Sequence, residues 1–213
     1  MTPTETAALA AGLRLLSFGF TKPDAESLEQ LRRLTVFCAR HARGESLAEL
    51  LGELEHELDD DDLLDELAAE YEELFGGAVR IAPYESSYED DPRRQTRRIA
   101  EIEASYRAFG AESGGPAGER ADHAGCELEF LALLVARELE AAEAGEAGRV
   151  ELCREAGDAF LRDHLGRWFP GFCREVAKET SSPVYRLLAL VGERVVLAGL
   201  AERGVERSSL RIR

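Results

Sequence analysis

The sequence ERADHAGCELEFLALL, residues 119–134, decides how this chain is expected to fold. Its second half is an apolar run with helical spacing, and its first half places ionisable side chains and a thiol at the start of that helix. Asp122 is the expected N-cap, because its carboxylate can accept hydrogen bonds from the orphan N–H groups of the first turn. His123 and Glu127 then share one face, with Cys126 beside His123. A helix does not need this polarity at its start, so the segment is predicted to be functional.

Composition restricts the class of protein to which the chain can belong. Its 213 residues, 45% of them hydrophobic, are enough to bury the core of one substantial domain. Acidic residues number 42 against 26 basic ones, which gives a formal net charge of −16. Such a charge repels nucleic acid and anionic membranes and favours cationic partners. We therefore expect neither nucleic-acid binding nor membrane insertion.

No targeting or membrane-spanning pattern is visible in the sequence. The residues after Met1 lack the basic region of a secretory signal, and no apolar run approaches about 18 residues. Four cysteines lie far apart within helical patterns, which indicates reduced, buried thiols: Cys38, Cys126, Cys153 and Cys173. We expect a soluble cytoplasmic protein.

Hydrophobic residues follow helical spacing almost throughout, and alternating strand-like runs are absent. The pattern predicts a single all-α bundle of about nine helices over residues 1–213. A Gly/Pro-rich stretch suggests a hinge at 110–121 between an N-terminal half (1–109) and a C-terminal half (122–204). After a first apolar stripe from Leu9 to Phe20, helices are expected to begin at Asp24, Ser46, the aspartates 59–62, Pro92, Asp122, Gly148 and Pro183.

The stretch after the helix predicted for residues 148–165 contains a proline. We expect Trp168–Phe172 to form a short separate element that leads into another helical turn or two. The aspartates 59–62 lack the glycine and the spacing of a calcium loop, so they are interpreted as helix-capping residues.

A metal site is the first alternative interpretation of the polar residues. His123-x-x-Cys126 and Cys38-x-x-His41 both have ligand-compatible spacing on a helix, and Glu127 could add an oxygen. A helical metal-dependent hydrolase built on His123, Cys126 and Glu127 is therefore a competing hypothesis. The paired Cys-x-x-Cys and His-Glu-x-x-His patterns are absent, so no metal is expected.

Nucleotide and nucleophilic chemistry have weaker support in the sequence. The two lysines, Lys22 and Lys178, are followed by proline and glutamate, so no phosphate-binding loop exists and no cofactor is expected. Ser86 and Ser87 have no histidine nearby in the sequence.

Tyr84 and Tyr88 are four residues apart, on one face if helical and on one side if extended. Tyrosine suits a binding surface because it combines a large apolar area with a polar tip. The alternative is a loop anchored to the core by two aromatic side chains, and the pattern leaves both open.

Three motifs occur in order along the chain: Pro83-Tyr-Glu-Ser-Ser-Tyr88, Glu119-x-x-Asp-His-x-x-x-Glu-Leu-Glu-Phe130, and Phe160-Leu-x-x-His-Leu-x-x-Trp-x-Pro-x-Phe172. Together they resemble the TorD/DmsD/NarJ family, cytoplasmic chaperones for molybdenum-dependent oxidoreductases that are also called redox enzyme maturation proteins. The likeness extends over roughly residues 5–203. Arg120-Ala121 departs from the proline that many relatives carry near the Asp-His pair.

The resemblance implies a protein that is not an enzyme. Such chaperones bind the twin-arginine signal peptide or the apo catalytic subunit of a molybdoenzyme, hold it until the molybdenum cofactor is inserted, and delay premature export. A monomer or a dimer that swaps halves through the hinge is expected. Trp168, Pro170 and Phe172 would be structural. The client-binding residues carried over from the family are Tyr84, Ser86, Tyr88, Glu119, Asp122, His123 and Glu127.

Overall fold

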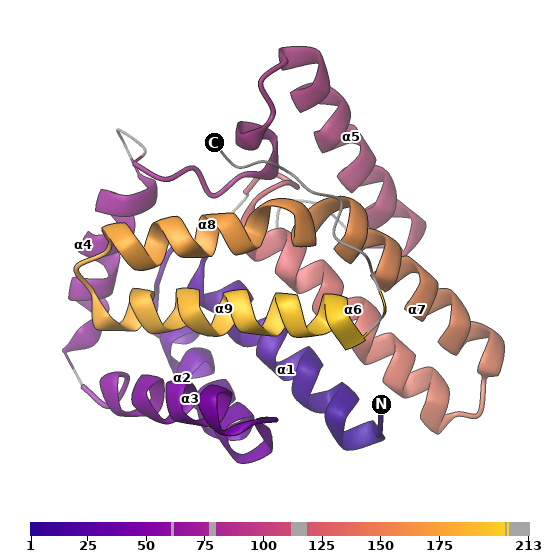
Figure 1. Ribbon diagram of the computed structural model, residues 1–213, viewed down its shortest axis with the longest axis horizontal. Helices are drawn as coiled ribbons and strands as arrows, with labels where there is room; N and C mark the ends of the chain where they lie inside the picture. The colour runs from indigo at the N-terminus through magenta and orange to yellow at the C-terminus, as the bar shows by residue number, and fades with distance from the viewer. Residues whose placement is uncertain (61, 77–79, 112–118, 203, 205–213) are drawn as a thin grey trace.

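The computed structural model describes residues 1–213 except 61, 77–79, 112–118, 203 and 205–213. The described residues form helices, with no β-strand beyond one isolated bridge, so the predicted all-α class is confirmed (Figure 1). The elements in chain order are α1 (Pro3–Gly19), α2 (Ala25–His41), α3 (Glu45–Glu57), α4 (Leu63–Phe75), the 3-10 turn η1 (Glu85–Tyr88), α5 (Pro92–Ala108), α6 (Ala124–Glu143), α7 (Ala147–Phe160), the π turn η2 (Leu161–Leu165), α8 (Gly166–Glu179) and α9 (Pro183–Glu202).

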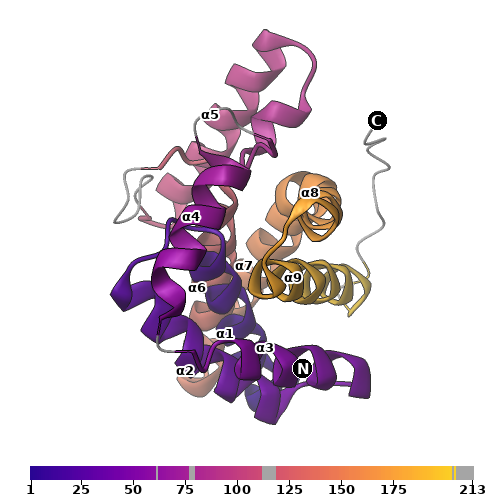
Figure 2. The same cartoon turned by 90° about the vertical axis from the view of Figure 1, so that its left-hand side faces the viewer.

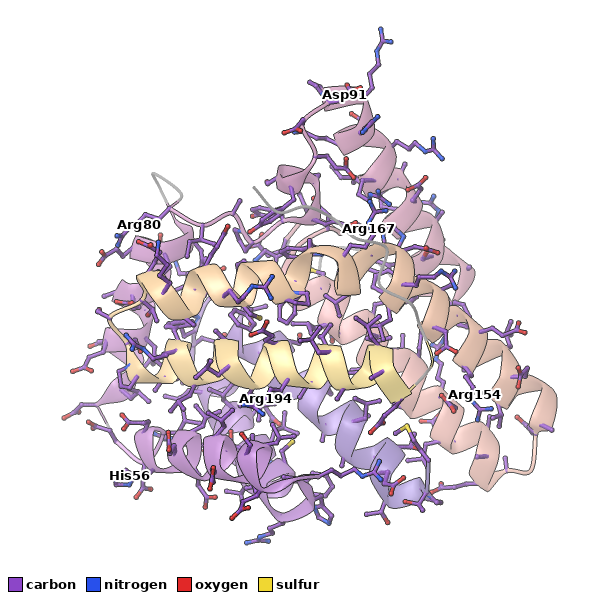
Figure 3. All side chains as sticks on the ribbon, in the orientation of Figure 1. His56, Arg80, Asp91, Arg154, Arg167 and Arg194 are labelled. Carbon is purple, nitrogen blue, oxygen red and sulfur yellow. The ribbon has the colours of Figure 1, made fainter. Side chains whose placement is uncertain are left out.

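Helix α1 is the centre of the packing, because it contacts α2, α6 and α9. Helices α8 and α9 lie side by side in Figure 1 and are seen nearly end-on in Figure 2, and α6 packs against α7. Charged side chains such as Asp91 and Arg154 lie around the outside (Figure 3). None of the described helices has the length and apolar content needed to cross a membrane.

Aromatic side chains form two clusters in the core. Phe20 of α1 meets Phe172 of α8 with ring centroids 5.2 Å apart. Around the start of α6, Phe130 contacts Tyr106 of α5 at 4.6 Å and Phe160 of α7 at 4.9 Å. Such edge and offset contacts add to the free energy gained from burial. The stretch α7–η2–α8 therefore contributes a ring to both clusters.

Several helix starts follow the signals in the sequence. The Asp24 carboxylate accepts from the Ser27 N–H at 2.7 Å, and the Ser27 hydroxyl accepts from the Asp24 N–H at 2.8 Å. Pro92 occupies the first turn of α5 after the cap residue Asp91, and α9 begins at Pro183. These predicted helix starts are confirmed. A capping side chain accepts a hydrogen bond from an N–H group that has no partner within the helix, and a proline in the first turn has no N–H that needs a partner.

The prediction of a short separate element at Trp168–Phe172 was wrong. Helical structure runs without interruption from Ala147 to Glu179, and Pro170 lies inside it. Proline in a helix costs about 3 kcal/mol. Full burial of a large apolar side chain contributes about 1.5–3 kcal/mol, and three aromatic residues around this proline are at most 1% exposed: Trp168, Phe169 and Phe172. Tertiary packing therefore outweighs the local helix-breaking signal.

The predicted hinge lies mostly outside the described residues. Helix α5 ends at Ala108 with Phe109 as its C-cap, and Gly110 adopts a positive φ of 63°. Residues 112–118 are not among those described. The division of the chain into two halves thus stays a prediction.

Candidate functional site

The loop before α5 is bound to the start of α6 by backbone hydrogen bonds. The Glu85 N–H donates to the Asp122 carbonyl at 2.9 Å, and the Ala124 N–H donates to the Pro83 carbonyl at 2.8 Å. Tyr84 and His123 form the isolated antiparallel bridge between these two bonds. Two motifs some 40 residues apart in the sequence are thereby joined into one surface.

Asp122 lies beneath this loop and is fully buried. Its carboxylate accepts from the Ser86 N–H at 3.1 Å and from the Arg120 guanidinium at 3.0 and 2.7 Å. The same guanidinium donates to the Ser86 hydroxyl at 2.7 Å. The prediction that Asp122 is the N-cap of α6 was therefore wrong. Its carboxylate binds the loop before α5 instead of the first turn of the helix.

His123 takes the N-cap position. Its Nδ1 accepts from the Gly125 N–H at 3.1 Å, so the proton of the neutral ring is on Nε2. Burial lowers the pKa of His123, which favours this neutral form. The side chain is 0% exposed, and Nε2 has no hydrogen-bond partner among the described residues. An unpaired buried donor costs roughly 1–3 kcal/mol, so His123 is an energetically costly residue at this position.

Glu127 is the second residue of the site whose burial is expected to lower the stability of the fold, because its carboxyl group is also fully buried. Its Oε2 accepts from the indole N–H of Trp168 at 3.2 Å. Burial and the neighbouring carboxyl of Glu85 raise the pKa of Glu127 well above its ordinary value. Burial thus favours the protonated form of Glu127, whose Oε1 has no hydrogen-bond partner among the described residues.

Glu85 and Arg98 belong to the site but were missed in the sequence. Glu85 Oε2 lies 3.0 Å from Nδ1 of His164, and Oε1 lies 3.3 Å from Nε of Arg98. Arg98 also pairs with Glu89 at 2.9 Å. The available signal for Glu85 was its place inside the first motif. Arg98 gave no such signal, because only the fold brings α5 to the loop. We refer to Glu85, Asp122, His123 and Glu127 as the buried polar layer.

The two tyrosines are both half-buried and are held in place by different contacts. Tyr88 donates to the Ala82 carbonyl at 3.3 Å, and its ring lies 5.4 Å from that of Trp168. Tyr84 donates to Glu119 at 3.0 Å, while the Arg120 guanidinium lies 4.5 Å above its ring. Burial raises the pKa of Tyr84 to about 12, so the phenol retains the proton that it donates. Tyr84, Arg120 and Glu119 form the accessible rim above the buried polar layer.

Two observations concern the metal and thiol chemistry considered for this site. Within the described residues, no group of three histidine, cysteine, aspartate or glutamate side chains could hold a metal ion. Burial raises the pKa of Cys126 to about 12, so this residue is a thiol and not a thiolate at neutral pH. The structure brings Tyr84, Ser86, Glu119, Asp122 and His123 together by direct contacts. Glu127 lies in the layer beneath, and Tyr88 lies beside Trp168.

Residues 40–174 match the family described as nitrate reductase delta subunit, which is more than half of the chain and contains all three motifs. The chain belongs to this family. The family resemblance drawn from the motifs is thereby confirmed.

This delta-subunit family member is also similar to a curated protein and to a solved structure. The chaperone protein TorD of Aeromonas salmonicida (strain A449) is 32% identical over 123 residues, which cover 55% of this chain and 50% of that protein. The match thus spans about half the length of the curated relative. A crystal structure from Archaeoglobus fulgidus, proposed to be a redox enzyme maturation protein, has a TM-score of 0.59 and 21% identity and covers 88% of this chain and 93% of that one. At that identity the likeness shows the fold alone.

Proposed function

We propose that this delta-subunit family member is a cytoplasmic, non-enzymatic chaperone for a molybdenum-dependent oxidoreductase. In this role it binds the twin-arginine leader or the apo catalytic subunit, assists cofactor insertion and delays export. Membership of the family and similarity to a TorD chaperone support the role. The chain would act as one chaperone domain, as a monomer or as a dimer that exchanges halves through residues 110–121.

The observation that carries the proposal is the rim of Tyr84, Glu119 and Arg120 supported by the buried polar layer. A twin-arginine leader joins a basic region to an apolar segment. Glu119 offers the basic region a carboxylate, and Tyr84 offers the apolar segment a half-buried aromatic face. The net charge of −16 would mainly increase the association rate.

The buried members of the predicted client site act through the rim. Ser86, Asp122, His123 and Glu127 are buried, so a client that docks on this conformation contacts the side chains that they position. Asp122 holds Arg120, and His123 lies edge-on to the Tyr84 ring at 5.2 Å. Tyr88 stays in the proposed site as a half-buried neighbour of the rim.

Fluorescence anisotropy with a labelled twin-arginine leader peptide tests the proposal. Glu119→Gln is expected to weaken binding about threefold to tenfold, in line with loss of about 1 kcal/mol from a partly buried charge pair. The control is Glu143→Gln, which removes the same charge from the exposed end of α6. Equal affinities of the two variants would contradict the site.

Two substitutions in the buried layer provide a further test. Asp122→Ala and His123→Ala should each weaken leader binding while circular dichroism shows unchanged helix content. If either variant unfolds, or if both bind the leader normally, the assignment of these residues fails. Elemental analysis addresses the competing hydrolase hypothesis, because stoichiometric zinc or iron in the purified protein would favour it.

A further inference from the structure

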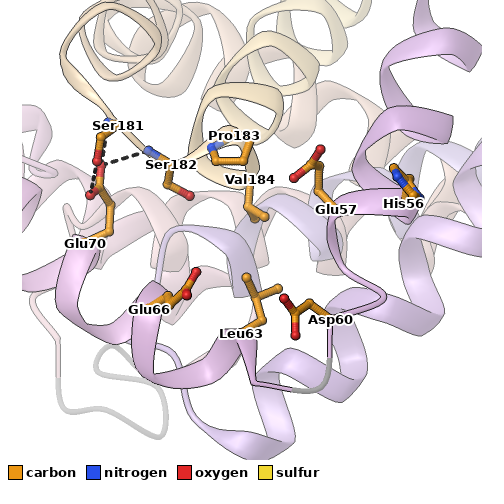
Figure 4. Close-up of a pocket in the computed structure, with 10 residues that line it drawn as sticks. All are labelled: His56, Glu57, Asp60, Leu63, Glu66, Glu70, Ser181, Ser182, Pro183 and Val184. Carbon is orange, nitrogen blue, oxygen red and sulfur yellow. Dashed lines mark hydrogen bonds between the residues drawn. The ribbon is translucent and has the colours of Figure 1, made fainter.

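A second surface lies where the end of α3, the start of α4 and the start of α9 meet (Figure 4). It contains a cavity of about 390 Å³ and an adjoining one of about 450 Å³. The two cavities share His56, Glu57, Ser181 and Pro183. None of the residues that line them belongs to the rim or to the buried polar layer. The cavities border α4 from Leu63 to Glu70, whereas the rim and the buried polar layer belong to the loop before α5 and the start of α6.

Carboxylates dominate the lining. The cavity of about 390 Å³ is lined by four of them: Glu57, Asp60, Glu66 and Glu70. The adjoining cavity is also lined by Glu53. Glu70 is engaged within the fold, because it accepts from the Ser181 N–H at 2.8 Å and from the Thr180 hydroxyl. The other four make no ion pair with any described residue, and we call them the acidic end: Glu53, Glu57, Asp60 and Glu66.

Apolar side chains adjoin these carboxylates. Leu187 and Leu190 of α9 line the second cavity together with Pro183. In the first cavity, Leu63 and Val184 lie between the carboxylates (Figure 4), but both are buried. The Glu70 contacts fix the start of α9, so this combination of negative charge and apolar surface is held on packed helices.

Positive charge within the lining is scarce. The first cavity has no arginine or lysine among its described lining residues. Arg186 borders the second, where its guanidinium donates to the Thr180 carbonyl at 3.3 Å. An acidic hollow beside apolar surface is complementary to a peptide that carries positive charge on one side and apolar groups on the other.

We propose that the acidic end is a docking surface for a cationic amphipathic segment of a partner protein, distinct from the leader site. Arginine or lysine side chains of that segment enter the cavity between Glu57 and Glu66. Its apolar side chains lie on Leu190 and Pro183, the apolar residues of the second cavity that are not buried. Nucleic acid is disfavoured as the occupant, because its phosphates would face unpaired carboxylates.

Fluorescence anisotropy tests this proposal with a labelled helical peptide that carries arginines on one face and leucines on the other. The double variant Glu57→Gln/Glu66→Gln is expected to bind it about fivefold more weakly, because two partly exposed charge pairs are lost. The matched control is Glu143→Gln/Glu155→Gln, which removes the same net charge from exposed positions on α6 and α7. This control should bind within about twofold of the wild type.

The outcomes separate this proposal from the proposed function. Equal losses in both double variants, or no loss in Glu57→Gln/Glu66→Gln, would overturn the docking surface. Glu119→Gln should leave binding of the amphipathic peptide unchanged, and a large loss there would assign the peptide to the leader site instead. Leu190→Ala should weaken binding at high salt as well as low salt, since the apolar contact is not screened. Circular dichroism of each variant verifies that it is folded.

Discussion

The buried polar layer and the acidic end are both rich in carboxyl groups, but these groups differ in burial and in whether they have partners. In the buried polar layer, Asp122 is paired with a guanidinium, and burial raises the pKa of Glu127, which favours its protonated form. At the acidic end, Glu53, Glu57, Asp60 and Glu66 remain without ion pairs to described residues and face solvent at least in part.

The difference follows from the cost of removing a charge from water. A buried charge is tolerated when it is paired or neutralised, and its partners then become fixed in position. An exposed charge costs little to keep and attracts a partner over a distance of roughly one Debye length. The buried polar layer therefore organises a surface, whereas the acidic end is suited to attract a partner directly. Matched substitutions in the two regions test this contrast.

The largest difference is expected for Asp122→Ala compared with Asp60→Ala. Loss of the Asp122 carboxylate leaves the buried Ser86 N–H without its acceptor and removes two hydrogen bonds from the half-exposed Arg120 guanidinium, so we expect a loss of about 3 kcal/mol in the free energy of unfolding. The Asp60 carboxylate accepts a single hydrogen bond, from the exposed Asp62 N–H at 3.0 Å, and the backbone carbonyl that accepts from Arg32 is kept in the variant. Its loss should cost no more than about 1 kcal/mol. Urea unfolding measures both, and similar values would contradict the contrast.

A smaller difference is expected for alanine at two glycines. A Cβ at Gly125 would lie 2.5 Å from the Thr21 methyl group and 3.2 Å from the Ser17 carbonyl oxygen. Because α1 must move away, the added Cβ costs about 2 kcal/mol, and the helix propensity of alanine offsets roughly 1 kcal/mol of this cost. Gly125→Ala should therefore lower the free energy of unfolding by about 1 kcal/mol. At Gly52 of α3 nothing lies within 4 Å of the added Cβ. Gly52→Ala should stabilise the protein by about 0.5–1 kcal/mol through helix propensity, and thermal unfolding would reveal opposite shifts in Tm.

The smallest expected effect concerns pH. The pKa of Glu127 in the folded protein lies above the ordinary value of 4.5. Its contribution to stability is therefore complete below that value and is lost as the pH rises toward the folded-state pKa. Glu127→Gln should thus reduce the fall in unfolding free energy as the pH rises above the ordinary value of 4.5. Glu66→Gln at the acidic end is the control, and a pH profile altered equally by both would argue against a protonated Glu127.

Local signals in the sequence were sufficient for much of the fold. Caps and proline positions gave the starts of α2, α5 and α9, because these signals act within one turn of the residues concerned. Helical spacing gave the all-α class for the same reason. Pro170 misled the prediction, since the burial of the aromatic residues around it is a property of the whole fold.

Features of the candidate site that depend on long-range contacts could not be predicted from local sequence. The motifs identified most members of the site, but their burial could not be predicted, because it depends on the loop before α5 covering the start of α6. The exchange of roles between Asp122 and His123 has the same origin. Asp122 has a partner at Ser86, 36 residues away, and this long-range contact displaces the cap that the local sequence favours.

The π turn at Leu161–Leu165 has a consequence for insertions and deletions. An α-helix turns by about 100° per residue, and a π turn accommodates one additional residue in the same hydrogen-bonded stretch. This extra residue sets the phase between Phe160, which faces Phe130, and Phe172, which faces Phe20. Deleting one residue here would retain a continuous helix but rotate everything beyond it by more than a quarter of a turn. A single-residue deletion in this turn would therefore separate Phe172 from Phe20 while Phe160 kept its contact with Phe130.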